Sequence, residues 1–206
     1  MSRGAATAAG FGAVLLWATL AVLTVAAAPV PPFQLAAMCF AVGAAVGLGW
    51  AGARGRLGAL RGLGPRVWAL GVLGLWGYHA LYFTALRLAP PAEAGLIAYL
   101  WPLLIVLFSG LLPGERLRRG HVIGALLAAL GAGLLLGGGA AFSGGAAPGY
   151  AAALICAFVW SGYSVLSRLV GEAPTEGVAG FCAAAAVLSL IVHLAVETTV
   201  WPGSAV

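Results

Sequence analysis

Charged residues are sparse, and they divide the chain into long uncharged intervals. Three intervals between neighbouring charges, at 66–87, 93–115 and 176–197, hold 20, 21 and 20 uncharged residues. A helix of about 20 apolar residues crosses a hydrocarbon core about 30 Å thick, so each interval predicts one membrane-spanning helix. Two longer intervals, at 3–54 and 119–168, hold 50 and 48 uncharged residues and have room for two helices each.

Both long intervals contain a break where a helix is expected to end. The first is interrupted by Pro29, Pro31 and Pro32, and the second by the glycine-rich stretch 137–149. The pattern therefore predicts an all-α polytopic membrane protein of about seven transmembrane helices. We expect these helices at roughly 6–28, 33–53, 67–87, 91–112, 121–139, 149–169 and 177–196.

The composition supports a lipid environment and disfavours several functions. Of the 206 residues, 63% are hydrophobic and 7% are charged, whereas soluble domains carry about 25% charged residues. The sequence has no Lys, Asp or Asn, and it lacks the HExxH, GxSxG and CxxC motifs. An intramembrane protease, an ATPase and a thiol oxidoreductase are thus disfavoured. We expect a protein that is not an enzyme and that holds no metal or cofactor.

Arginine positions predict the orientation in the membrane. Nine of the ten arginines fall in the N-terminal segment or in loops on the same side, and Arg87 falls on the other side. The positive-inside rule makes the arginine-rich side cytoplasmic, which predicts a multi-pass bacterial inner-membrane protein with a cytoplasmic N-terminus. The net charge of +5 is then a topology signal and does not indicate a nucleic-acid partner.

A secretory signal peptide is an alternative for the first helix. Arg3, the apolar run that follows and the three alanines at 26–28 imitate its n-region, h-region and cleavage site. Pro29 would then occupy the first mature position, where cleavage is disfavoured. We therefore interpret the segment as a retained span.

The sequence also contains an internal duplication. An offset of 143 residues aligns Trp17 with Trp160 and Cys39 with Cys182. A repeated unit of five helices, an odd number, enters the membrane from opposite faces, as in inverted-repeat transporters. We expect a first repeat at 5–140, the first two helices of an inverted second repeat at 149–198, and a tail at 199–206.

The second repeat stops at Val206, before the counterparts of its third, fourth and fifth helices. Polar side chains that those helices would cover are costly to expose to lipid. We expect the chain to be a fragment completed by further C-terminal helices, or a chain that self-associates. A non-transporting membrane subunit is an alternative that this organisation leaves open.

The third helix carries polar aromatic residues on one face. Tyr78, His79 and Tyr82 fall within about 100° of arc when successive residues turn by about 100°. They can line a cavity whose rings stack on a flat solute and whose polar groups bind its polar end. The alternative is that they donate to carbonyls of adjacent helices as packing contacts.

The sixth helix carries a second stripe of this kind. Trp160, Tyr163, Ser164 and Ser167 follow the spacing i, i+3, i+4 and i+7, and the duplication relates Trp160 to Trp17. Two repeat-related tryptophans near mid-bilayer favour a central pathway, whereas an interfacial aromatic belt would place them near the membrane surface.

The fourth helix is expected to kink at Pro102, because proline lacks the amide that would bond the carbonyl of Ala98. Tyr99 and Trp101 lie about 200° apart on a straight helix, so both can face one cavity only if the kink turns them. Glu93 lies in the first turn, where a carboxylate complements the helix dipole. Its alternative role is in proton coupling.

Two further features concern the scaffold. Glu115 is expected to pair with a nearby arginine and fix a corner on the cytoplasmic side. Glycines four residues apart predict close helix packing, and they occur as Gly43 and Gly47, Gly120 and Gly124, and Gly133 and Gly137.

Several motifs together resemble one family. The runs are APPAEAGLI at 89–97, YLWPL at 99–103 and GERL at 114–117, followed by Gly124 and Gly131. Over 5–196 the chain resembles EamA-type permeases of the drug/metabolite transporter superfamily, and it is most similar to the YddG-type aromatic amino-acid exporters. The resemblance implies ten helices in two inverted repeats, cytoplasmic termini and efflux of aromatic amino acids by alternating access. An EamA permease for a different metabolite or drug is the alternative within the family.

Overall fold

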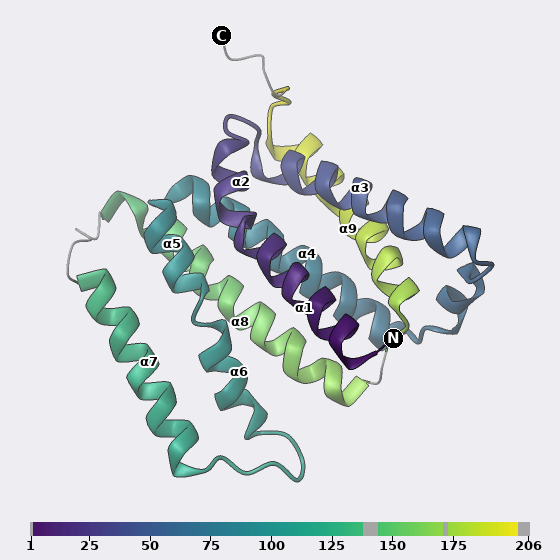
Figure 1. Ribbon diagram of the computed structural model, residues 1–206. Coiled ribbons are helices and arrows are strands. Elements are labelled where there is room, and N and C mark those ends of the chain that lie inside the picture. Colours follow the sequence, from purple (N-terminus) through teal and green to yellow (C-terminus); the bar gives the residue numbers. More distant parts are fainter. Residues whose placement is uncertain (1, 138–143, 171–172, 202–206) are drawn as a thin grey trace.

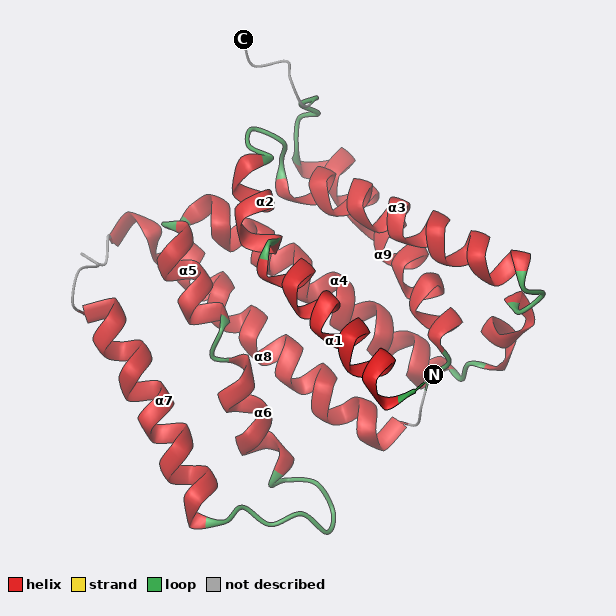
Figure 2. Ribbon diagram, in the orientation of Figure 1, coloured by secondary structure: helices red, strands yellow, loops and turns green. Residues whose placement is uncertain are grey.

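The fold is all-helical in the residues that the structure, a computed structural model, describes: 2–137, 144–170 and 173–201 (Figure 1). Every regular element in these ranges is helical, as Figure 2 shows. The elements are α1 (Arg3–Ala18), α2 (Leu20–Ala26), α3 (Pro32–Ala53), η1 (Leu57–Gly62), α4 (Pro65–Leu88), α5 (Pro91–Ala98), α6 (Trp101–Ser109), α7 (Arg119–Gly137), η2 (Gly144–Ala146), α8 (Ala147–Val170) and α9 (Thr175–Val196).

The prediction of an all-α polytopic membrane protein is confirmed. Among the described residues, six helical segments are long and apolar enough to cross a membrane, and 119–131 forms a shorter apolar helix. Each predicted span matches one helix or two consecutive helices. The end of the fifth predicted span, 138–139, lies outside the described residues.

Two of the predicted spans are broken. The break between α5 and α6 falls at 99–100, next to Pro102, as the sequence predicts. The break between α1 and α2 at Thr19 is not predicted, although the two helices together form one candidate span over Arg3–Ala26. There the hydroxyl of Thr19 donates to the carbonyl oxygen of Leu16 at 2.6 Å, and such local bonds compete with regular helix geometry.

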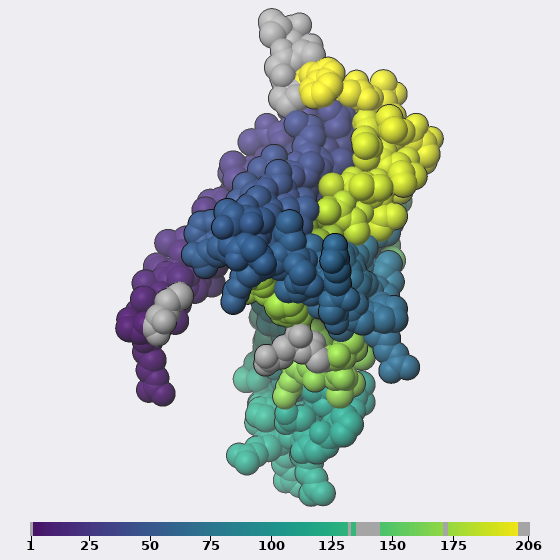
Figure 3. All heavy atoms as spheres, turned by 90° about the vertical axis from the view of Figure 1, so that its right-hand side faces the viewer, coloured from purple at the N-terminus to yellow at the C-terminus, as the bar shows by residue number. Residues whose placement is uncertain are grey.

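Helices α4, α8, α3 and α9 form the body of the molecule. Helix α3 packs along α9, α4 packs along α8 and against α9, and α5 and α6 lie on α8. Helix α7 packs on α6 and α5 at one edge (Figure 1). The N-terminal part of α1 projects from the body, as Figure 3 shows, and α1 contains no buried residue.

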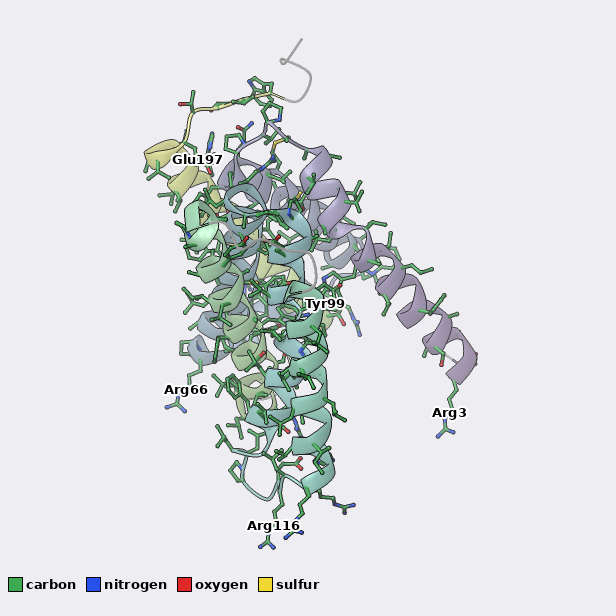
Figure 4. The ribbon with its side chains drawn as sticks, turned by 90° about the vertical axis from the view of Figure 1, so that its left-hand side faces the viewer. Arg3, Arg66, Tyr99, Arg116 and Glu197 are labelled. Atoms are coloured by element: carbon green, nitrogen blue, oxygen red, sulfur yellow. The ribbon has the colours of Figure 1, made fainter. Side chains whose placement is uncertain are left out.

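Charged residues mark the two ends of the helices. Figure 4 shows Arg3, Arg66 and Arg116 at one end, Glu197 at the other, and Tyr99 between them. Arg87, the exception in the sequence, lies near the Glu197 end. Its guanidinium donates to the carbonyl oxygen of Val30 at 2.8 Å and so binds the turn that precedes α3.

The α3–α9 interface is built from small residues. A Cβ added to Gly47 would lie 2.6 Å from the Cβ of Ala179, and one added to Gly43 would lie 3.8 Å from the Sγ of Cys182. This is the close packing that the glycine spacing predicts for α3. For α7 that prediction is wrong at the three glycines whose surroundings are described, because Gly120, Gly124 and Gly133 face open space.

One end of this interface is closed by a buried polar cluster. The carboxylate of Glu197 accepts hydrogen bonds from the backbone N–H groups of Phe33 and Gln34 at 3.0 and 3.1 Å. The Nδ1 of His193 lies 2.9 Å from the same carboxylate. The side-chain amide of Gln34 exchanges two hydrogen bonds of 2.9 Å with the backbone of Val200. An anion at a helix N-terminus satisfies amides that have no partner within the helix.

Candidate functional site

A cavity of about 220 Å³ lies between α1 and α2, α4, and the break between α5 and α6. We call it the central cavity. Five of the nine residues that line it are aromatic. Its lining residues are Val14, Trp17, Ala18, Leu20, Ala21, Tyr78, Tyr82, Tyr99 and Trp101.

Trp17 joins two walls of the cavity. Its ring stacks on Trp101 with centroids 6.0 Å apart and planes inclined by 23°. It also meets the edge of Trp160 at 5.5 Å. The two tryptophans that the sequence duplication aligns are therefore in contact with each other. Trp17 is 40% exposed, so the cavity is open on the side of this ring.

Helix α4 supplies the buried wall. Tyr78 and Tyr82 are 3% and 2% exposed, and their rings stack with centroids 5.6 Å apart. Tyr78 also packs on Trp160 at 4.9 Å. The two tyrosines stand one helical turn apart, which places both rings on the face that the sequence predicts.

The helix break turns two more aromatic residues toward the cavity. Tyr99 lies in the break and Trp101 is the first residue of α6, and both line the cavity. The carbonyl oxygen of Trp101 lies 3.0 Å from the Oγ of Ser161, which is fully buried on α8. That contact holds the backbone of the break against α8. Tyr99 is 55% exposed, so its ring borders the open side.

Four residues expected at the site are not part of the cavity lining. Trp160 packs behind it, on the rings of Trp17 and Tyr78. His79 is not part of the cavity lining, because its Nδ1–H donates to the carbonyl of Leu75 at 2.8 Å and its ring packs on Phe40 of α3. The hydroxyl of Ser164 donates to the carbonyl of Trp160 at 2.8 Å, within its own helix. Tyr163 lines a different cavity at the arginine-rich end.

Glu93 lies away from the central cavity, toward the start of α8. Its carboxylate accepts a hydrogen bond from the hydroxyl of Tyr150. This bond joins the first turn of α5 to the first turn of α8. Glu115, as predicted, pairs with an arginine: its Oε1 lies 2.8 Å from the Nη2 of Arg168.

Sequence reasoning missed Ser161 and Tyr150. Ser161 is adjacent to the predicted stripe, and its burial depends on the approach of α6 to α8. Tyr150 directly follows the glycine-rich stretch 137–149, where the sequence predicts a break between helices. Its position in the first turn of a predicted span, like that of Glu93, is the sequence feature that could have identified it. Within the described ranges, no three His, Cys, Asp or Glu residues gather in a way that could hold a metal ion.

Known proteins match this arrangement. Residues 4–137 match the model of the EamA-like transporter family. The aromatic amino acid exporter YddG of Ancylobacter novellus is 56% identical, in an alignment that covers 98% of this chain and 71% of that protein. A crystal structure of a protein with 56% sequence identity aligns with a TM-score of 0.80, covering 98% of this chain and 71% of that chain.

A family match of this extent and a relative of this identity agree with the helical architecture. EamA-family proteins are a class of transporters and not of enzymes. The chain is a multi-pass membrane transporter that belongs to the EamA-like transporter family.

Proposed function

We propose that this protein exports aromatic amino acids from the cytoplasm by alternating access, and that the central cavity binds them. The observation that carries the proposal is the set of five aromatic residues that meet at one cavity. Stacked and edge-on aromatic contacts add about 0.5–1.5 kcal/mol each to the burial of a ring, so such walls favour a flat aromatic solute. The residues are Trp17, Tyr78, Tyr82, Tyr99 and Trp101.

The similarity to an aromatic amino acid exporter supports the same substrate class. An amino acid also has polar ends, and mid-membrane polar partners are available beside the rings. The two tyrosine hydroxyls of α4 and the backbone carbonyls at the break between α5 and α6 can serve an ammonium group.

Alternating access rests on the inverted repeat, with units at 5–140 and 149–198. The contact between Trp17 and Trp160 supports it, because residues related by a two-fold axis meet when they lie near that axis. Rocking of one repeat against the other would then open the cavity to each side in turn.

The cavity requires a further wall on its open side, where Trp17 and Tyr99 are 40% and 55% exposed. We propose that additional helices cover this side, either of the same polypeptide or of a second copy. Cysteines placed at Val14 and Tyr99 should crosslink to the covering helices. A chain that transports with both positions facing lipid would contradict the proposal.

The proposed orientation has the N-terminus in the cytoplasm of a bacterial cell, with the protein in the inner membrane. It follows from the gathering of arginines at one end. With the native cysteines replaced, Gly145→Cys should react with an impermeant thiol reagent added to intact cells, and Arg61→Cys should not. Labelling of Arg61→Cys in place of Gly145→Cys would reverse the orientation.

Glu93 is the proposed coupling residue. It lies in a membrane-spanning helix, and its carboxylate holds the hydroxyl of Tyr150. If a proton on Glu93 drives transport, Glu93→Gln should abolish the dependence of export on a proton gradient while L-tryptophan binding remains. Unchanged coupling would leave Glu93 a structural residue that joins α5 to α8.

The test of function is transport in inverted membrane vesicles that contain the full chain. Radiolabelled L-tryptophan should accumulate, and Trp101→Ala should reduce the accumulation at matched protein level. Binding without transport would indicate a non-transporting membrane subunit. The absence of both would indicate an EamA permease for a different metabolite.

A further inference from the structure

A second cavity lies at the arginine-rich end of the molecule. It has a volume of about 590 Å³ and is bounded by α4, α8 and α9. We call it the arginine-end cavity. Its walls include apolar residues of α4 and α9 and three polar residues of α8, among them Leu70, Tyr163, Ser167, Arg168 and Phe181.

The two cavities share no lining residue, and aromatic rings separate them. Tyr163 lines the arginine-end cavity and packs on Trp160 with centroids 5.4 Å apart. Trp160 packs in turn on Tyr78 and Trp17, at 4.9 and 5.5 Å, and those two rings line the central cavity. The layer formed by Tyr163 and Trp160 is therefore the partition between the cavities.

The ring of Tyr163 packs directly against the backbone of Gly74, and we call this position the seat of Tyr163. A Cβ added to Gly74 would lie 2.3 Å from the Cδ2 of the Tyr163 ring, so the ring occupies the space that any other residue would fill. Along α4 the order is the arginine-end cavity beside Gly71, then the seat at Gly74, then Tyr78, then the central cavity at Tyr82. The face of α4 thus runs through both cavities and the partition.

The arginine-end cavity has the chemistry to hold an amino acid. The guanidinium of Arg168 pairs with Glu115 through Nη2, and a guanidinium carries five N–H donors, so it has capacity for a second carboxylate. The ring of Phe181 and the side chain of Leu70 supply an apolar wall for an aromatic side chain.

We propose that the arginine-end cavity is a second binding site for the exported aromatic amino acid. Arg168 binds its carboxylate there, and Tyr163, seated on Gly74, closes the passage to the central cavity. The proposal rests on the proposed function for its substrate, while the partition rests on the packing alone. When the ring of Tyr163 leaves Gly74, the space beside α4 that it filled joins the arginine-end cavity, and the passage to the central cavity runs along α4 past the remaining ring, Trp160.

The test is cysteine accessibility in sealed vesicles with the arginine-rich end facing the reagent. The full chain is used, with its native cysteines replaced. An impermeant thiol reagent should label Leu70→Cys and should leave Ala21→Cys, in the central cavity, unlabelled. Adding Tyr163→Ala should produce labelling of Ala21→Cys. Adding Tyr163→Phe, which keeps the ring, should not.

Substrate protection tests the binding site. L-Tryptophan should slow the labelling of Leu70→Cys, L-leucine should not, and Arg168→Gln should remove the protection. Equal labelling of Ala21→Cys with Tyr163 intact or removed would overturn the partition. L-Tryptophan that binds the central cavity without protecting Leu70→Cys would overturn the second site and leave the proposed function standing. A native chain whose central cavity does not bind L-tryptophan would instead refute the proposed function.

Discussion

The α3–α9 and α4–α8 interfaces both use glycine, and they use it for different purposes. At Gly47 the missing side chain lets the methyl group of Ala179 approach, so two helix backbones come close. At Gly74 the missing side chain makes room for the ring of Tyr163. Small side chains have few rotamers to order, whereas large rings leave cavities beside them when they pack imperfectly.

This difference suggests that the α3–α9 interface mainly stabilises the fold and that the α4–α8 interface mainly serves substrate binding. The glycines of the α3–α9 interface, Gly43 and Gly47, line neither of the two cavities. At one end of this interface the carboxylate of Glu197 accepts hydrogen bonds from the first amides of α3. The α4–α8 interface has a cavity at each side of its aromatic partition. Substitutions at α3–α9 should therefore change the unfolding temperature, and substitutions at α4–α8 should change substrate affinity.

The largest expected effect is at Gly47. Gly47→Leu places a side chain where the Cβ alone would already lie 2.6 Å from Ala179, so the helices must separate. Overpacking of this kind costs about 3 kcal/mol. The unfolding temperature of the purified protein in detergent should fall sharply. Gly49→Leu on the same helix is the control, because a Cβ there meets nothing within 4 Å. Equal losses in both variants would contradict the packing account.

The second effect is at Glu197. Glu197→Ala removes two hydrogen bonds to the α3 amides and the contact with His193. Hydrogen bonds to charged groups contribute about 1.5–3 kcal/mol, so we expect a destabilisation of about 2 kcal/mol, measured as a lower unfolding temperature. Glu115→Ala, which removes a pair whose side chains are 56% and 46% exposed, should change little. A larger effect at Glu115 would reverse the assignment.

A third effect should appear in binding. Tyr82→Ala and Trp101→Ala should each weaken L-tryptophan binding by about 1 kcal/mol beyond the lost contact area. Trp50→Ala is the control, because its ring is 62% exposed and contacts the guanidinium of Arg54. Trp68 is unsuitable as a control, since it packs on Phe181 at 5.3 Å. Equal weakening in all three variants would indicate lost stability and not a lost site.

The smallest effect is expected at the other end of the α3–α9 pair. There Arg56 and Glu176 form an ion pair of 3.0 Å whose arginine side chain is 65% exposed. Arg56→Gln should leave the unfolding temperature nearly unchanged, because solvent screens exposed pairs. A loss as large as that of Glu197→Ala would mean that the two ends are equivalent.

Much of the fold could be predicted because lipid imposes a simple rule on the sequence. Charges must lie near the ends of spans, so the spacing of arginines and glutamates located the helices. Pro102 predicts the break that brings Tyr99 and Trp101 to one cavity. The break at Thr19 had no such signal, because threonine also occurs within regular helices.

The site was harder to predict because a helix face is wider than a cavity. Tyr78, His79 and Tyr82 share one arc, yet His79 packs on Phe40 while the tyrosines line the cavity. Ser161 and Tyr150 act through partners about 60 residues away in sequence, and only the packing of the helices shows them. Gly120, Gly124 and Gly133 of α7, the glycines of these pairs whose surroundings are described, had the predicted spacing, and nothing lies within 4 Å of their Cβ positions.

The aromatic side chains of the central cavity are proposed to recognise aromatic amino acids. Competition for radiolabelled L-tryptophan bound to the full chain in lipid nanodiscs measures this recognition. Unlabelled L-tryptophan and L-phenylalanine should displace the label, whereas L-leucine and L-serine should not. Trp101→Ala should weaken binding, and Trp50→Ala should leave it unchanged. Displacement by L-leucine as effective as by L-phenylalanine would contradict the proposed recognition.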